Sequence, residues 1–517
     1  MKTSRYWFLF AACSIVWLTV SLLIAPSMSG VDVMIFRDAG WNLASTGSFE
    51  SAGLEYMRDL TPRLYSHYTP LMPLLFSGYA SVFPRNAYAG TIFNLLLGIL
   101  AAASALYWVL HSAYDGKLKA FAALAIAIFP VAFITYDRPE ALGFVFACAA
   151  ITYAARPGSR AMPAGLLIGL VFLAHPFAAL VTSVWVFAFF LLRNWKNPRR
   201  WTLTLAQTGI AGAFAALVLI PVAAVYYFLD PSSLGRFAVH ALGFNSGLGF
   251  AMHSKSSYLQ SFEKLGVLQA LRTRGFPIFF CLDSIFSFVV VLMLAAWVLL
   301  NRRRLGHAEW IPLAAGFASV LAAVFLFPRQ SYYMDLLAFL VPTGLLIASR
   351  WSGKLSFPGL VLLLVAIFSI FLPGYTFSLL LRFEQRSSYR AAREQPAYLL
   401  AHLPSPDAIV ALDGDYYDFF KQDFHHLFNT QHLGDGAVDT SAAAAVANCY
   451  SAFPGGPGMV RPLQKELNPS EFHLIQPAPE HMWITLFGHK ATSTQWGYGC
   501  DLYLRNEPAP DRKPSHL

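Results

Sequence analysis

The sequence predicts a polytopic α-helical membrane protein with a small α/β domain at its C-terminal end. Of its 517 residues, 56% are hydrophobic and only 13% are charged, whereas soluble domains carry about 25% charged residues. About eleven apolar segments resemble the stretches of roughly 20 residues that cross a bilayer as helices. The residues that follow the last of these segments have the composition of an ordinary soluble domain. We therefore expect a membrane region at residues 1–382 and a C-terminal domain at residues 383–517.

The composition also excludes several classes of protein. Lys and Arg number 37 against 28 Asp and Glu, which leaves a net charge of +9. This excess is too small and too dispersed to indicate nucleic-acid binding, and in a membrane protein it usually reflects cytoplasmic loops. Disorder, collagen-like repeats and a small disulfide-dense secreted fold are excluded by the same composition. We find no internal repeat and no His/Cys cluster with metal-ligand spacing, so the function has to be sought in the loops.

The first apolar segment, residues 6–26, follows Lys2 and Arg5 and is interpreted as an uncleaved span because many apolar segments come after it. Two later segments are short and flank His175-Pro176, where one long helix kinked by the proline is the alternative. The predicted later spans are residues 89–110, 118–135, 140–155, 163–174, 177–192, 205–229, 276–300, 310–327, 333–349 and 357–381.

Loop charge decides between eleven spans and ten, because short cytoplasmic loops are enriched in Lys and Arg. With the N-terminus in the cytoplasm, eleven spans place the basic loops inside, including Arg193, Arg199 and the cluster 302–304. Ten spans would put that cluster outside. We therefore expect eleven spans, a cytoplasmic N-terminus and an extracytoplasmic C-terminal domain.

One further apolar run, residues 67–84, is interpreted as an interfacial helix on the outer face. Counting it as a span would reverse the side of every later loop, and its three prolines and its glycine suit a helix lying in the interface. The first outer loop then extends over about residues 27–88.

The C-terminal domain shows strand-like runs at residues 408–412 and 483–487 and holds two cysteines, Cys449 and Cys500. A disulfide between them would require an oxidising compartment. In the chain-entropy model, closing this loop of roughly 50 residues would add about 4 kcal/mol of stability. Two unpaired thiols are the alternative. The other three cysteines lie within predicted spans, where thiols usually pack as small apolar groups.

The first outer loop is rich in carboxylates and aromatic residues, and long loops often carry function. Residues 35–44 have helical spacing and end near Gly47, a typical helix stop. Asp32 lies just before this helix at the membrane surface, as a functional carboxylate or as its N-cap. Asp38 is interpreted first as a solvated helix-face residue, and contact with a substrate is the functional alternative for Asp38 and for Arg63.

A second acidic group, Asp137-Arg138-Pro139-Glu140, follows the third predicted span at the same membrane face. If the two groups meet in one cavity, one carboxylate could take a proton from an attacking hydroxyl while another orients the acceptor or binds a cation. Arg138 could bind a phosphate. A simple interfacial ion pair of Asp137 with Arg138 is the alternative.

These residues resemble a known family. The spacing of Asp32, Phe36, Gly47 and Phe49 is similar to the first-loop signature of the GT-C membrane glycosyltransferases. The most similar branch contains the aminoarabinose transferase of lipid A and the protein O-mannosyltransferases. A proline-rich outer helix, a basic cytoplasmic hairpin and an Arg-Pro-acid motif follow in the same order, and the resemblance covers about the first 200 residues.

The resemblance implies an inverting transferase in a bacterial inner membrane, with a polyprenyl-phosphate sugar as donor and a lipid, glycan or protein as acceptor. It implies Asp32 as the base for the acceptor hydroxyl, assisted by Glu140 or Asp137. No cofactor is implied, although some branches use a divalent cation.

Two positions depart from the family pattern. Val33 stands where the family often has a glutamate, and the lysine that precedes the proline pair in the lipid A branch is absent. His67 or Tyr68 stands nearby instead. Arg329 is the substitute candidate for binding the donor phosphate, together with Arg138.

Two other functional classes remain alternatives. A secondary transporter would show repeated halves and paired charges near the bilayer midplane, whereas the ionisable residues here gather at one face. A non-catalytic assembly protein would use its outer domain to bind a partner. A water-filled cavity containing Asp32 would favour the enzyme, and a dry bundle would favour the assembly protein.

Overall fold

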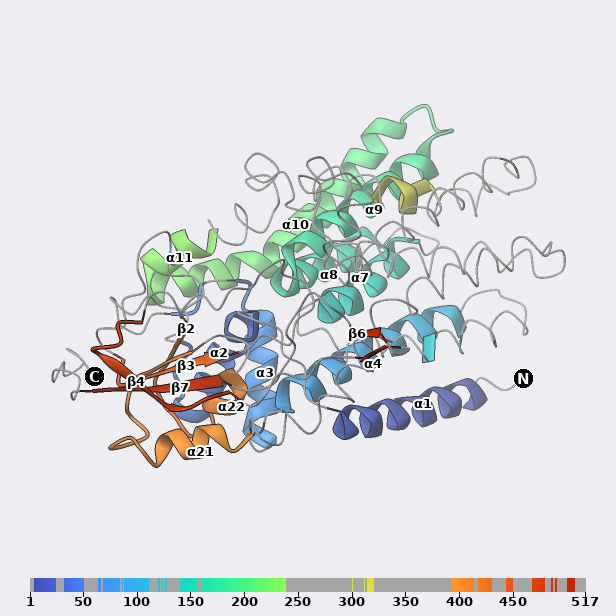
Figure 1. The fold of residues 1–517 in the computed structure, drawn as a ribbon. Coiled ribbons are helices and arrows are strands. Elements are labelled where there is room, and N and C mark those ends of the chain that lie inside the picture. Colours follow the sequence, from blue (N-terminus) through green and yellow to red (C-terminus); the bar gives the residue numbers. More distant parts are fainter. Residues whose placement is uncertain are drawn as a thin grey trace.

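The fold combines a bundle of apolar helices with a mixed β-sheet at one end of the bundle (Figure 1). The computed structural model describes residues 4–24, 32–50, 64–66, 68–83, 86, 88–110, 120, 123, 126–127, 140–155, 160–238, 300, 311, 314–319, 393–412, 417–429, 443–449, 467–478, 485–486, 489–490 and 500–506.

Four of the described helices are long and apolar enough to cross a membrane. They are α1 (Ser4–Leu23), α4 (Ala89–Leu110), of which residues 89–107 form the apolar stretch, α9 (Pro176–Asn194) and α10 (Arg200–Leu229). The shorter apolar helices α7 (Glu140–Ala155) and α8 (Ala161–Ala174) pack between them. The predicted spans at residues 118–135, 276–300, 310–327, 333–349 and 357–381 lie wholly or mostly outside the described residues, so the total of eleven stays a prediction.

Helices α8 and α9 are separate elements rather than one long kinked helix. His175 between them has extended backbone. A Cβ added at Gly165 would meet Ala211, and one added at Gly169 would meet Val218. Because the higher residue number in α8 faces the higher residue number in α10, the two helices run parallel. Because α9 connects the end of α8 to the start of α10, it must run back in the opposite direction.

The helix ends therefore gather at two ends of the bundle. Tyr88, which precedes α4, donates its hydroxyl to the carbonyl of Ile24 at the end of α1, at a distance of 3.2 Å. The same end holds α2 (Asp32–Thr46), α3 (Leu71–Val82) and α11 (Pro231–Ala238). The predicted outer helix at residues 67–84 corresponds to α3.

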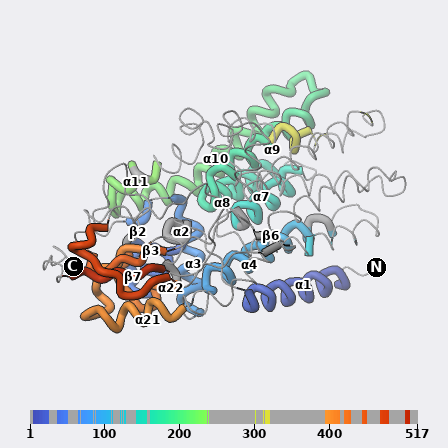
Figure 2. Tube along the Cα trace, in the orientation of Figure 1, coloured from blue at the N-terminus to red at the C-terminus, as the bar shows by residue number. Residues whose placement is uncertain are grey.

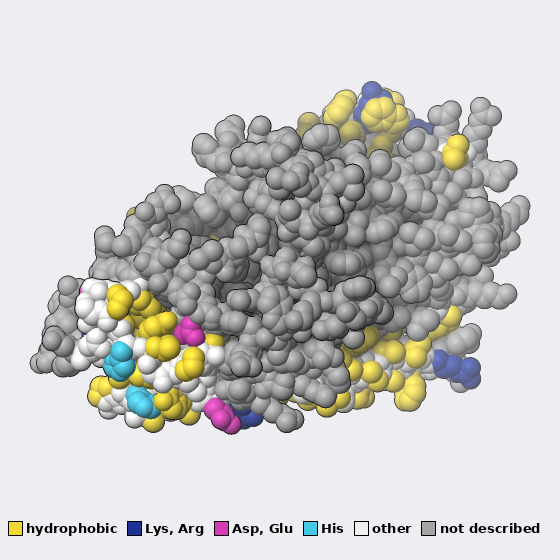
Figure 3. Space-filling model, in the orientation of Figure 1, with side chains coloured by type: hydrophobic (Ala, Val, Ile, Leu, Met, Phe, Trp, Pro, Cys, Tyr) yellow, Lys and Arg dark blue, Asp and Glu magenta, His cyan; other side chains and the backbone are white. Residues whose placement is uncertain are grey.

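The opposite end of the bundle is basic. Exposed Lys and Arg side chains lie there at the turn after α9 and at the start of α1 (Figure 3), and Arg160 before α8 is exposed as well. The described residues of this end include no Asp or Glu, and its basic residues are Arg5, Arg160, Arg193, Lys196, Arg199 and Arg200.

The C-terminal domain is built on a five-stranded sheet of order β2-β1-β3-β7-β4. Its strands are β1 (Val410–Leu412), β2 (Leu427–Asn429), β3 (Ala445–Cys449), β4 (Phe472–Gln476) and β7 (Cys500–Arg505). Strand β1 pairs parallel with β2 and β3, whereas β7 pairs antiparallel with β3 and β4. A separate hairpin joins β5 (Thr485–Leu486) to β6 (His489–Lys490). Both predicted strand-like runs therefore contain a strand.

Cys449 and Cys500 face each other across β3 and β7 and form a disulfide. The side-chain amide of Gln395, at the start of α21 (Gln395–Leu400), makes two hydrogen bonds to the backbone of Cys500. It donates to the Cys500 carbonyl at 2.6 Å and accepts from the Cys500 N–H at 2.7 Å. The disulfide thus joins the last residue of β3 to the first residue of β7. Cys13 and Cys148 are free thiols within helices.

Candidate functional site

Helix α2 has the start and the stop that the loop sequence predicts. It begins at Asp32 and ends at Thr46, and Gly47 follows with a φ of 79°. The Gly47 N–H donates to the Leu43 carbonyl at 3.1 Å, which is the left-handed glycine stop typical of helix C-termini. The helix is longer than the predicted residues 35–44. The Asp32 side chain lies outside the described part of the structure, so its N-cap role stays untested.

An aromatic cluster connects α2 to the bundle. The ring of Phe36, one turn after Asp32, packs edge-to-face on Tyr68 with centroids 5.1 Å apart. Tyr68 in turn lies 6.1 Å from the imidazole of His175. Next to Tyr68, the Thr69 hydroxyl donates to the carbonyl of Ala174, the last residue of α8, at 3.1 Å. The first outer loop is thereby fixed to the α8–α9 turn.

His175 is fully buried and caps α9. Its Nδ1 accepts from the Ala178 N–H at 3.0 Å, so this nitrogen carries no proton and the proton of the neutral ring is on Nε2. A Cβ added at Gly143 would lie 3.1 Å from the His175 Cβ. Gly143 is three residues after Glu140, where α7 begins. The His175 ring therefore lies one turn from the start of α7.

These contacts bring the starts of two distant helices to the same cluster. Asp32 begins α2 and Glu140 begins α7, and the chain of contacts between them runs through Phe36, Tyr68 and His175. The side chains of the two acids are outside the described residues. The structure thus places the first turns of α2 and α7 beside one cluster, whereas the distance between the two carboxylates lies outside what it describes.

Asp38 differs from the interpretation as a solvated helix-face residue. Its side chain is only 1% exposed, and its Oδ1 lies 3.8 Å from Nζ of Lys421 in the C-terminal domain. Asn42 Nδ2, one turn further along α2, lies 3.4 Å from the same oxygen. The prediction failed because the C-terminal domain covers this face of α2.

Arg37 is a buried residue of this region that sequence reasoning missed. Its guanidinium occupies the space above Gly90, where an added Cβ would overlap it, and lies 5.9 Å from the centre of the Phe76 ring. The glycine at the start of α4 was the sequence signal that could have predicted a side chain packed there, since only a residue without a side chain leaves room for the Arg37 guanidinium.

Helices α10 and α11 hold the second half of the first outer loop. The Tyr226 hydroxyl donates to the Tyr65 carbonyl at 2.5 Å, and the Ser233 hydroxyl donates to the Leu64 carbonyl at 3.1 Å. Burial, with a smaller contribution from the neighbouring Tyr226 and Asp38, raises the pKa of the Tyr65 phenol well above its ordinary value. Tyr65 therefore stays protonated and cannot act as a base near neutral pH.

Several predicted site residues lie outside the described part of the chain. Within that part, no group of three or more His, Cys, Asp or Glu side chains is arranged to hold a metal ion. Tyr68 is described but buried, and it packs between Phe36 and His175. The candidates outside the described residues are Arg63, His67, Asp137, Arg138 and Arg329.

Two solved structures that are similar to this chain are of ArnT from Cupriavidus metallidurans. The undecaprenyl phosphate-bound crystal structure is 15% identical, with 84% of this chain and 87% of that chain covered at a TM-score of 0.44. The apo crystal structure is 11% identical, with 97% and 98% covered at a TM-score of 0.49. No protein-family model matches the chain, and no curated protein matches it.

Proposed function

We propose that this protein is an inverting glycosyltransferase that moves a sugar from a polyprenyl phosphate to an acceptor hydroxyl at the extracytoplasmic membrane face. The observation that carries the proposal is the meeting of two helix starts, those of α2 and α7, around Tyr68 and His175. These helices begin at Asp32 and Glu140, the acids that the family resemblance singles out. Acids from two remote loops at one end of a bundle are what a shared reaction centre needs.

The proposed chemistry needs one base and one stabilised leaving group. Asp32 takes the proton of the acceptor hydroxyl while the oxygen of that hydroxyl attacks the anomeric carbon of the sugar. The bond between the anomeric carbon and the phosphate oxygen breaks at the same time. The polyprenyl phosphate leaves with its electron pair, and Arg138 and Arg329 stabilise the developing negative charge. Glu140 or Asp137 orients the acceptor. Attack from the face opposite the leaving phosphate inverts the anomeric configuration.

The apolar bundle supports a lipid-linked donor. Four described helices suit membrane crossing, and the basic end of the bundle lies opposite α2 and the C-terminal domain. Since basic loops favour the cytoplasm, α2 and the proposed site face the extracytoplasmic side of an inner membrane. Nucleotide sugars are not expected there, so the sugar arrives on a lipid carrier. Undecaprenyl phosphate, named in the ArnT complex, belongs to this class of carrier.

The reaction as proposed requires no cofactor. Assistance by a divalent cation, held by Asp32 together with the second-loop acids, is the alternative. The acceptor class is a lipid, glycan or protein hydroxyl.

The deciding experiment is the Asp32→Asn substitution, assayed for sugar transfer from polyprenyl-phosphate-linked sugars extracted from the host membrane. Loss of the general base lowers the transfer rate by about 10²–10⁴-fold, while expression, elution volume and bound polyprenyl phosphate detected by mass spectrometry stay normal. Glu471→Gln, which changes a carboxylate of the C-terminal domain that is 46% exposed, is the matched control and keeps full activity. Normal transfer by the Asp32→Asn protein would refute the assignment and favour a transporter or assembly protein.

A further inference from the structure

An ion pair connects the C-terminal domain to the helix that begins with Asp32. Nζ of Lys421 lies 3.8 Å from Oδ1 of Asp38, and the two side chains are 9% and 1% exposed. The same Nζ donates to the carbonyl of His425 at 3.2 Å. Lys421 thus spans from its own domain to α2. A charge pair withdrawn from water to this degree depends strongly on both partners, because loss of either removes the opposite charge from beside a buried ionised group.

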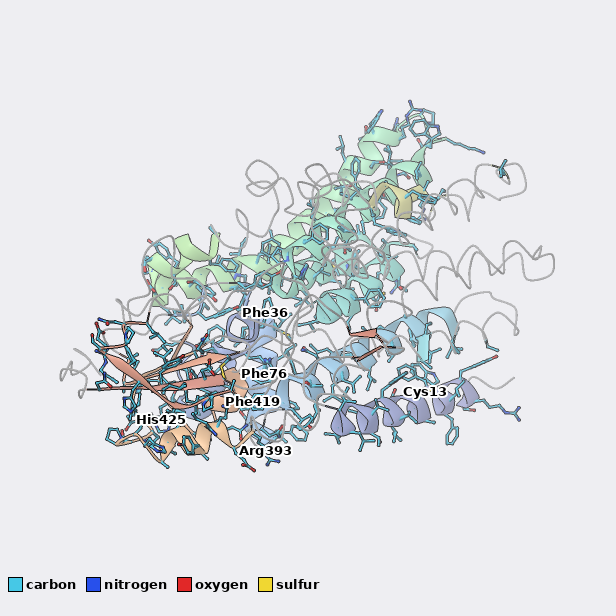
Figure 4. The ribbon with its side chains drawn as sticks, viewed as in Figure 1. Cys13, Phe36, Phe76, Arg393, Phe419 and His425 are labelled. Atoms are coloured by element: carbon cyan, nitrogen blue, oxygen red, sulfur yellow. A yellow bond between two sulfur atoms is a disulfide. The ribbon has the colours of Figure 1, made fainter. Side chains whose placement is uncertain are left out.

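Aromatic packing surrounds this ion pair. Lys421 directly follows α22 (Tyr417–Phe420), which lies against α2. Phe419 and Phe420 are buried in the same hydrophobic core as Phe36 and Phe76 of the outer-loop helices. Figure 4 labels Phe36, Phe76 and Phe419 at this junction, and Figure 2 shows the C-terminal domain beside α2 and α3. The C-terminal domain is therefore packed onto the outer-loop helices.

Helix α2 transmits the position of Asp38 to Asp32. The two residues are six positions apart in one uninterrupted helix, which at 1.5 Å per residue is about 9 Å along its axis. On another face, Gly40 lies so close to α3 that an added Cβ would be 2.6 Å from the Pro73 carbonyl oxygen. With α3 on that face and Lys421 beside Asp38, the direction of α2 depends on both neighbours.

We propose that Lys421 is a positioning residue, and that the C-terminal domain acts through it to hold α2 and its first residue, Asp32, in the reactive geometry. This inference rests on the proposed function, since it concerns the placement of the proposed base. Lys421 touches neither substrate nor reacting atoms in this role. It acts only through Asp38.

The test is Lys421→Met in the full-length protein, which keeps an unbranched apolar stem and removes the charge. A displacement of about 1 Å at a reacting group can cost about 100-fold in rate, so we expect kcat to fall about 100-fold. KM for the extracted polyprenyl-phosphate sugars should change less than about threefold, because donor-binding groups are untouched. Lys421→Arg, which keeps the charge, should restore part of kcat.

The matched control is Glu471→Gln. It disrupts the Arg505–Glu471 ion pair, which has the same N–O distance of 3.8 Å but lies within the C-terminal domain. We expect normal kcat for this variant. A kcat for Lys421→Met within about twofold of wild type would overturn the proposal, and so would an equal loss in both variants.

A second measurement does not depend on activity. Amide hydrogen exchange in the full-length protein should become faster across residues 32–46 in Lys421→Met but not in Glu471→Gln, because local exchange reports local opening. If Lys421→Met does not fold, Asp38→Asn provides the same test from the other partner. Unchanged exchange in α2 in a folded variant that has lost the ion pair contradicts the proposed role.

The two proposals fail separately. An active Asp32→Asn protein refutes the glycosyltransferase assignment and leaves no base for Lys421 to position. An inactive Asp32→Asn protein together with a fully active Lys421→Met protein removes only the positioning role.

Discussion

Asp230, between α10 and α11, illustrates how a single carboxylate fixes a helix boundary. Its Oδ1 accepts from the Ser232 N–H at 3.0 Å and from the Ser232 hydroxyl at 2.6 Å, and its other oxygen accepts from Ser233. These hydrogen bonds hold the pKa of Asp230 far below its ordinary value of 3.8. Because the folded-state pKa is depressed, the stabilisation is fully present above the unfolded-state pKa and is lost as the pH falls from there through the folded-state pKa.

We therefore predict a pH-dependent effect of Asp230→Ala. At pH 7 the loss of this N-cap should cost about 1 kcal/mol, and the difference from wild type should shrink as the pH falls below about 4. Thermal unfolding in mild detergent at pH 7, 5 and 3 measures it. Asp230→Asn is the control, since asparagine keeps a capping oxygen without the charge. A cost of Asp230→Ala that is the same at every pH would contradict this account.

At the residue scale, local chemistry could be predicted and long-range contacts could not. Gly47 ends α2 as expected because the left-handed conformation is a property of the turn itself. Asp38 was expected in solvent because nothing near it in the sequence covers it. Its partner, Lys421, comes from the far end of the chain. Such a pairing depends on how two domains dock, which no local pattern encodes.

At the element scale, the close contact between α8 and α10 requires a glycine. A Cβ at Gly165 would lie 2.2 Å from the Ala211 carbonyl oxygen and 2.7 Å from its Cα, so a helix backbone would have to move. Small residues that let helix backbones approach are typical of packing between membrane helices. This contact fixes the parallel arrangement that brings the end of α10 to the end of the bundle that holds α2 and α3.

We predict that Gly165→Ala lowers the stability of the protein by about 1–3 kcal/mol, the usual cost of overpacking. Gly209→Ala on α10 is the matched control. It has nothing within 4 Å of the added Cβ, so it should be neutral or gain up to about 1 kcal/mol from helix propensity. The midpoint of thermal unfolding in detergent distinguishes them. Equal midpoints for the two variants would show that the α8–α10 contact is looser than described.

Apolar runs in the sequence predicted the described apolar helices well, because a segment that is buried or faces lipid along its whole length must consist mostly of apolar residues. The break at His175 also left a trace, since Pro176 follows it and prolines favour the first helix position. The order of the strands in the sheet, in contrast, has no corresponding pattern in the sequence. Parallel pairing of β1 with β2 and β3 depends on the crossovers between them rather than on the strand residues.

At the scale of the whole molecule, the helix directions divide the described residues into two chemically different ends. One end carries α2, α3, α11 and the C-terminal sheet, and the other carries exposed basic residues. The sequence predicted this division from loop charge alone, because the bias of Lys and Arg acts on each short loop independently. The docking of the C-terminal domain onto α2 was not predictable, since it depends on shape and on single contacts between remote segments.

This division predicts which residues are reached from each side of the membrane. With Cys13, Cys148 and Cys281 replaced by serine, we introduce cysteine at exposed Ser45, in the last turn of α2, or at exposed Lys196, in the turn after α9. A membrane-impermeant maleimide should label the Ser45→Cys protein in intact cells, or in spheroplasts if an outer membrane is present. The Lys196→Cys protein should react only after the membrane is permeabilised. The reverse pattern would put α2 in the cytoplasm, where nucleotide sugars are available, and would remove the physical reason for a lipid-linked donor.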